Sequence, residues 1–102
     1  MTDPVASCLL IAKVLVADGI MAEPERAFLA RSMESLGLTD EEQRQVRLLD
    51  GFDEAEQIVA TRTTADKQAL VDRLLEAALV DGKLSPHETA TIARLTKTLG
   101  LP

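Results

Sequence analysis

Four carboxylates stand at matching places in two similar stretches of this chain. Asp18 and Glu25 belong to the string ADGIMAEPE, and Asp81 and Glu88 belong to the string VDGKLSPHE. In each string, an Asp-Gly pair is followed at the same spacing by an apolar residue and a glutamate. Carboxylate oxygens are preferred ligands of calcium, magnesium and manganese, so these residues are candidate ligands for a divalent cation. Glu23 is a candidate third carboxylate in the first string.

The same carboxylates have a structural alternative. Glu88 stands three places after Ser85, the spacing of a capping box, in which the glutamate accepts a hydrogen bond from the N–H of the capping residue. Asp81 would accept N–H bonds from its own turn, and Gly82 would supply the positive φ. We expect this capping role in the second string. The first string has Ala22 where a capping oxygen would stand, so if one turn alone holds a cation, we expect it to be the first.

The spacing also resembles the second half of an EF-hand loop, with Asp at position 5, Gly at position 6 and Glu at position 12. The first half is missing. Loop positions 1 and 3 fall on apolar residues in both copies: Val14, Val16, Ala77 and Leu79. An ordinary EF-hand is therefore excluded, because these side chains cannot bind a hard cation.

The elements that must position these residues are all helical. Apolar residues recur at three- and four-residue steps, and no segment alternates with the period of two that a strand requires. The fold class is therefore all-α, a single compact domain of about six helices. We expect helices at about 4–18 and 23–36, a short one from the Thr39 cap through Leu49, one at about 53–61, a long one capped by Thr63 or Thr64, and one from Pro86 to a stop at Gly100. The expected core comprises Leu9, Val16, Leu29, Leu36, Leu74, Leu79, Ile92, Leu95 and Leu99.

The chain divides into two helical hairpins and an acidic middle. The two strings belong to an internal repeat, in which each copy is a helix, an Asp-Gly turn and a second helix ending in Leu-Gly-Leu. We place the first hairpin at about 4–38, the acidic middle at about 39–62 and the second hairpin at about 63–101, within one domain, 1–102. Residues 40–56 carry a net charge of −5, so the middle forms an acidic face.

Composition excludes several classes of function. A net charge of −6 repels phosphate backbones, and Phe28 and Phe52 are the only aromatic residues, so we expect no nucleic-acid binding. The most apolar stretch, from Leu9 to Ala17, is interrupted by Lys13 and is about half the length of a membrane span, so we expect no membrane insertion. The N-terminus does not resemble a secretory leader, and a lone cysteine does not indicate an oxidising compartment, so we expect a cytoplasmic protein.

The strings ADGIMAEPE and VDGKLSPHE, each followed by a helix ending in LGL, resemble the TerB-like family of tellurite-resistance proteins. That family also occurs as the N-terminal module of DnaJ-like co-chaperones. The resemblance implies an all-helical domain whose acidic residues are suspected of chelating a metal. It also implies a place in membrane-associated or stress-response assemblies.

We therefore expect a non-enzymatic interaction module that docks a partner protein or a stress-response assembly through an acidic surface. The alternative is a small domain that binds or senses a divalent cation through its Asp-Gly turns. We expect no enzyme, because no nucleophile stands beside a base in the sequence. Association of the chain with copies of itself stays open.

Overall fold

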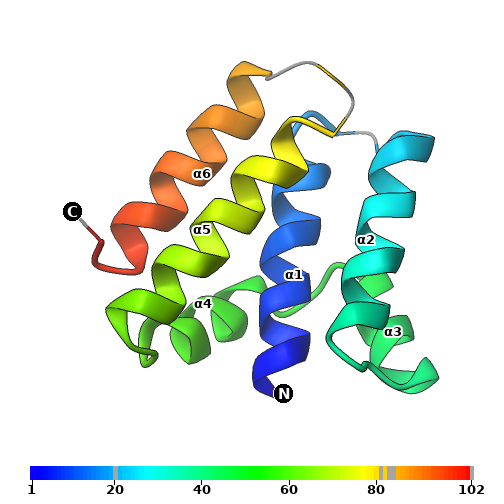
Figure 1. Cartoon of the computed structure of the whole chain (residues 1–102), viewed down its shortest axis with the longest axis horizontal. Coiled ribbons are helices and arrows are strands. Elements are labelled where there is room, and N and C mark those ends of the chain that lie inside the picture. The colour runs from blue at the N-terminus through cyan, green and yellow to red at the C-terminus, as the bar shows by residue number, and fades with distance from the viewer. Residues whose placement is uncertain (20, 81, 83–84, 102) are drawn as a thin grey trace.

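The structure is a computed structural model that describes residues 1–19, 21–80, 82 and 85–101. This part of the chain contains six α-helices and no strand, which confirms the expected all-α fold (Figure 1). The helices are α1 (Asp3–Leu15), α2 (Glu23–Ser35), α3 (Asp40–Arg47), α4 (Phe52–Ala60), α5 (Thr64–Ala78) and α6 (Pro86–Thr98).

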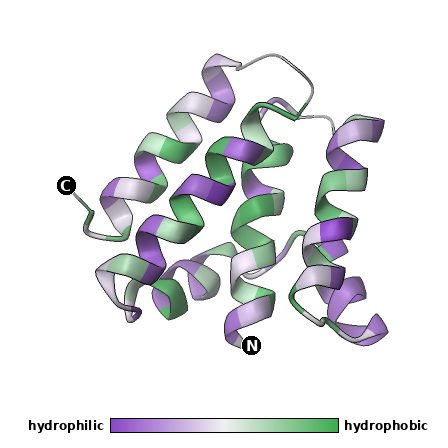
Figure 2. Ribbon diagram, in the orientation of Figure 1, coloured by the Kyte–Doolittle hydropathy of each residue, from purple (hydrophilic) through white to green (hydrophobic). Residues whose placement is uncertain are grey.

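The first helix, α1, is the centre of the molecule. Its residues from Val5 to Leu15 are all buried except Lys13, and each of the other five helices packs against it. Its hydropathy shows the same role, because α1 is apolar around most of its circumference (Figure 2). Lys13 is half-buried, donates to Glu56 Oε1 at 2.8 Å and lies 5.7 Å from the centroid of the Phe52 ring. The single charge of this segment is therefore paired where it meets α4.

Local capping sets where the helices begin. Thr39 and Glu42 form the expected capping box of α3, and Ser85 and Glu88 form that of α6. The cap of α5 is Thr63, whose hydroxyl accepts the N–H of Asp66 at 3.1 Å. Because a cap depends on residues only three places apart, the sequence places these three helix starts correctly.

The expected core needs three corrections. Leu9, Leu29, Leu74, Ile92, Leu95 and Leu99 are buried as expected. Leu36 and Leu79, however, are 44% and 55% exposed, and Val16 is only half-buried. All three are the C-cap residues of their helices. The apolar spacing continues to these positions in the sequence, but the helix ends there and the side chain is no longer covered by neighbouring helices. The end of α1 is also earlier than expected, at Leu15 rather than about residue 18.

The helix ends that flank the two Asp-Gly strings lie at one end of the molecule. The C-terminal ends of α1 and α5 lie there, together with the N-terminal ends of α2 and α6 (Figure 1). Gly19 and Gly82 have φ values of 94° and 82°, which confirms the positive φ expected at both turns. None of the described helices is long and apolar enough to cross a membrane.

The helices α2 and α5 stand on two sides of α1. The helix α2 packs chiefly against α1, whereas α5 packs against both α1 and α6. Residues of α2 and α5 line a groove between these two helices, and residues of α1 form its floor.

Candidate functional site

Glu88 is a buried carboxylate that serves as the expected helix cap. Its Oε1 accepts the N–H of Ser85 at 3.3 Å, and its own N–H donates to the Ser85 hydroxyl at 3.1 Å. The residue is only 2% exposed, and its Oε2 finds no hydrogen-bond partner in the described part of the chain. The Oε1 atom therefore acts as a helix cap, whereas Oε2 is a buried acceptor with no assigned role.

Glu25 occupies the same position in α2. It is 2% exposed, and its Oε1 accepts the N–H of Ala22 at 2.9 Å. Ala22 has no side-chain oxygen to complete the pair, as the sequence indicates. Both glutamates therefore hold the first turn of a helix with one oxygen, a role that needs no metal.

Two of the other candidate ligands, Asp18 and Glu23, lie within the residues that the structure describes. Asp18 is exposed beyond the end of α1, and the carboxylate of Glu23 pairs with Arg26 at 2.8 Å. Asp81 lies outside the described residues. Within the residues that the structure describes, no three Asp, Glu, His or Cys side chains lie close enough together to hold a metal ion.

A second feature is an acidic surface, which we define as the exposed acids in the first turns of α3 and α4: Asp40, Glu41, Asp53 and Glu54. The start of the chain lies against both turns. The amino terminus is 3.7 Å from Glu54 Oε2, and the Thr2 hydroxyl donates to Glu42 Oε2 at 3.4 Å. The negative charge of the acidic surface is thus carried by the N-terminal turns of two consecutive helices, which residues 1 and 2 both contact.

Glu42 itself belongs to the capping box at the edge of this surface. A hydrogen bond from the Thr39 backbone N–H lowers the pKa of the Glu42 carboxyl, with smaller contributions from the Thr39 and Thr2 hydroxyls. Glu42 is therefore negatively charged at neutral pH, since the carboxylate form is the one that these donors favour.

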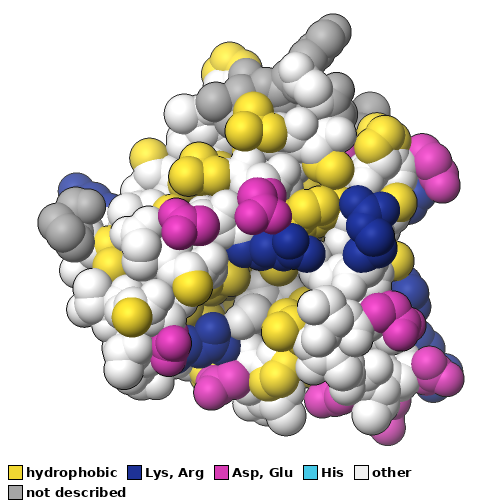
Figure 3. All heavy atoms as spheres, in the orientation of Figure 1, with side chains coloured by type: hydrophobic (Ala, Val, Ile, Leu, Met, Phe, Trp, Pro, Cys, Tyr) yellow, Lys and Arg dark blue, Asp and Glu magenta, His cyan; other side chains and the backbone are white. Residues whose placement is uncertain are grey.

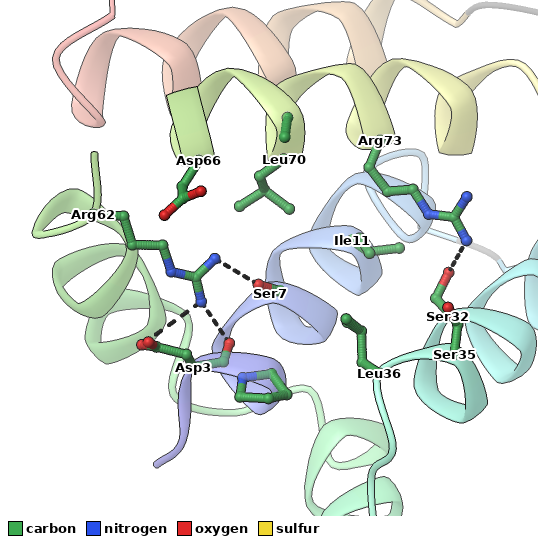
Figure 4. Close-up of a pocket in the computed structure, with 12 residues that line it drawn as sticks. Asp3, Ser7, Ile11, Ser32, Ser35, Leu36, Arg62, Asp66, Leu70 and Arg73 are labelled. Carbon is green, nitrogen blue, oxygen red and sulfur yellow. Dashed lines mark hydrogen bonds and ion pairs between the residues drawn. The ribbon is translucent and has the colours of Figure 1, made fainter. Parts of the chain in front are cut away.

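A third feature is the groove between α2 and α5, a hollow of about 500 Å³. Two arginines lie at its opposite ends (Figure 4). Arg62 donates to the Ser7 hydroxyl at 2.8 Å and to the Asp3 carbonyl oxygen at 2.6 Å. Arg73 donates to the Ser32 hydroxyl at 2.9 Å. The groove is not predictable from the sequence, because its residues come from separate segments and share no spacing.

A further hollow, of about 770 Å³, lies where α2 meets the ends of α1 and α3. Apolar side chains line much of it, including Met21 and Met33, and Arg26 and Arg47 lie at its wall. Leu49, which also lines it, has a φ of 55°, an unusual conformation for a branched side chain. Leu49 therefore stores backbone strain beside an open apolar surface.

Cys8 does not supply a nucleophile. Its side chain is fully buried in α1, and burial raises the pKa of its thiol to about 11, against a smaller opposing effect of the Arg73 charge. A thiol that stays protonated at neutral pH is a poor nucleophile.

Comparison with models of known protein families gives a match. The model of the family described as tellurite resistance protein TerB matches residues 5–102. No curated protein and no solved structure matches the chain. The matched region includes nearly all of α1, the whole of the five later helices, and both Asp-Gly strings on which the resemblance rests. The chain therefore belongs to the TerB family of tellurite resistance proteins.

Proposed function

We propose that this protein is a non-enzymatic interaction module that docks a partner protein, or a stress-response assembly, through its acidic surface. The observation that supports the proposal is the exposure of four carboxylates on two helix starts held together by residues 1–2. Each acid also stabilises the first turn of its own helix, and the two first turns together add their charges into one negative field.

The partner that fits this surface is a basic segment of a protein. Lysine and arginine side chains would meet the carboxylates, and the negative field would speed their encounter at low ionic strength. Exposed pairs of this kind are screened by salt, so the affinity should fall as the salt concentration rises.

The test uses a synthetic amphipathic peptide rich in lysine and the double variant Glu41→Gln/Glu54→Gln. We expect this variant to bind the peptide more weakly than the unaltered protein and with a shallower dependence on salt. The matched control is Glu34→Gln/Asp72→Asn, which removes the same charge from exposed positions on α2 and α5. Equal losses in the two variants would show that net charge alone, and not this surface, attracts the peptide.

A second candidate function is binding of a divalent cation at the Asp-Gly turns. It is favoured by Glu88 Oε2, a buried oxygen without a hydrogen-bond partner in the described residues. The described carboxylates do not by themselves form a set of three ligands, so such a site would need Asp81 or bound water as well.

Thermal melting separates this candidate from the capping role. If a cation binds, calcium, magnesium or manganese should raise the melting temperature, and both Glu88→Gln and Asp81→Asn should abolish that gain. Asp81→Asn should also stabilise the metal-free protein, because it removes one of the repelling carboxylates. If the carboxylates only cap helices, no cation should shift the melting temperature, and either substitution should cost about 0.5–2 kcal/mol.

A further inference from the structure

The groove between α2 and α5 has the shape of a site for a helix. Its two walls and its floor are themselves helices, and its hollow of about 500 Å³ falls within the range of roughly 300–1,000 Å³ found for binding clefts. The part of α5 that lines it, from Asp66 to Arg73, rises by about 10 Å, which is two helical turns.

The centre of the groove is apolar. Ile11, Leu36 and Leu70 lie between the two arginines (Figure 4). Ile11 and Leu70 are buried, but Leu36 leaves 44% of its surface exposed at the groove edge. Hydrophobic and basic side chains also lie next to each other in the hollow between α5 and α2 in the space-filling view (Figure 3). An apolar stripe of this kind matches the buried face of an amphipathic helix.

Arg73 is held in place at one end of the groove. Its guanidinium group lies 4.5 Å from the centroid of the Phe28 ring and donates to the buried Ser32 hydroxyl at 2.9 Å. A guanidinium group has five donors, so these contacts leave others for a ligand. Because the arginine is already ordered, binding a carboxylate there loses little side-chain entropy.

Arg73 pairs at present with Glu76 on the same helix, at 2.9 Å, and the Glu76 side chain is 61% exposed. A partner's carboxylate can replace that of Glu76. An exposed pair of this kind contributes little stability. A carboxylate inside the groove would be less accessible to water and would interact more strongly with the same guanidinium group.

The opposite end of the groove has mixed charge. Arg62 contacts Asp3, whose Oδ1 is 3.7 Å away, and Asp66 also lines this end. An additional carboxylate would meet both attraction and repulsion there. The preference for a negatively charged group in the bound segment therefore comes from the Arg73 end of the groove.

We propose that this groove binds a short amphipathic helix of a partner protein, with apolar residues packed on Leu36 above the floor that Ile11 and Leu70 form, and a carboxylate paired with Arg73. The partner is thus acidic at one end, in contrast to the basic segment proposed for the acidic surface. The proposal does not depend on that function, because the groove and the acidic surface use different residues.

The test uses a panel of fluorescently labelled synthetic peptides of about three helical turns. Each carries leucines at three- and four-residue steps and one glutamate at an end of the leucine stripe. We expect saturable binding by fluorescence anisotropy, weak enough to be transient because the interface is small. We expect backbone amide shifts by NMR to be concentrated in α1, α2 and α5.

Two protein variants and one peptide variant identify the contacts. Leu36→Ser and Arg73→Gln should each weaken binding by about tenfold or more, since one loses an apolar contact and the other a charge-assisted hydrogen bond. Replacing the peptide glutamate by glutamine should weaken binding similarly. This peptide change tests the same ion pair without altering the protein, so it remains informative if Arg73→Gln lowers stability.

Matched controls are available outside the groove. Leu75 is 43% exposed but does not line the groove, so Leu75→Ser should leave the affinity unchanged. Arg94→Gln removes an exposed cation from α6 and should also have no effect.

Several results would overturn the proposal. They are the absence of binding by every peptide in the panel, equal binding of the glutamine peptide, and amide shifts centred outside the groove. Sedimentation of the protein as a dimer that Leu36→Ser dissociates would instead assign the groove to a second copy of the chain. None of these results would affect the separate test of Glu41 and Glu54.

Discussion

At the scale of single residues, Cys8 has a property that can be measured directly. Burial raises the pKa of its thiol from an ordinary value of 9.0 to about 11. Because the folded state holds the proton more tightly than the unfolded state, its contribution to stability is complete below pH 9 and is lost as the pH rises toward 11. The expected loss is about 1.4 kcal/mol per pH unit within that window.

We predict that chemical unfolding curves will show this alkaline loss of stability in the unaltered protein. The variant Cys8→Ala, which has no titrating thiol, should show a shallower loss over the same pH range. We also expect iodoacetamide to modify Cys8 much more slowly in the native protein than in denaturant. Identical pH dependences in the two proteins would contradict the proposed effect of burial.

Gly82 permits a second prediction at this scale. Its φ is 82°, and, its chain neighbours aside, a Cβ added there would meet no atom of the described residues within 4 Å. The cost of Gly82→Ala should therefore come from the backbone conformation alone, and we expect about 1 kcal/mol or more. Gly82→Asn should cost less, because asparagine tolerates a positive φ better than alanine. Equal thermal stability of all three proteins would exclude this explanation.

At the scale of helices, α5 offers a matched pair of leucines. Leu74 is fully buried against α1, whereas Leu79 is 55% exposed at the C-cap. We predict that Leu74→Ala will lower the free energy of unfolding by about 2–5 kcal/mol, because it leaves a cavity in the core. Leu79→Ala should lower it by less than about 0.5 kcal/mol. A large loss at Leu79 in chemical denaturation would show that this side chain is covered in solution.

Helix starts and the burial of single side chains differ in how well the sequence predicts them. The starts of α3 and α6 are predictable because each depends on a hydrogen-bonded pair three residues apart, such as Ser85 and Glu88. The burial of Leu79 is not predictable in the same way. It has the spacing of a core residue, but its burial depends on where other helices cross, which the local pattern does not encode.

The same reasoning explains which parts of the candidate sites were predictable. The capping role of Glu88 follows from its spacing, and the acidic surface follows from a local excess of charge. The α2–α5 groove was missed because Ser7, Ser32 and Arg73 lie far apart in the sequence and meet only through packing on α1. The lack of a hydrogen-bond partner for Glu88 Oε2 among the described residues was not predicted either, since residue spacing does not show which atoms are buried.

At the scale of the whole molecule, the position of α1 should make unfolding cooperative. Every other helix packs on it, so no pair of helices retains a complete core without it. We predict a single transition, in which loss of helical circular dichroism coincides with exposure of Cys8 to a thiol reagent. Exposure of Cys8 at a lower denaturant concentration than the loss of helix would reveal an intermediate. Leu75→Ser, which changes only an exposed side chain, should leave the coincidence intact.

The central place of α1 also matters while the protein is being made. This helix is synthesised before all five of the helices that bury it. Until they follow, the nascent chain presents an almost uninterrupted apolar segment from Val5 to Leu15. Such a segment is a binding site for chaperones and is prone to aggregate. The risk of aggregation is therefore greatest before the five later helices are available to cover this segment.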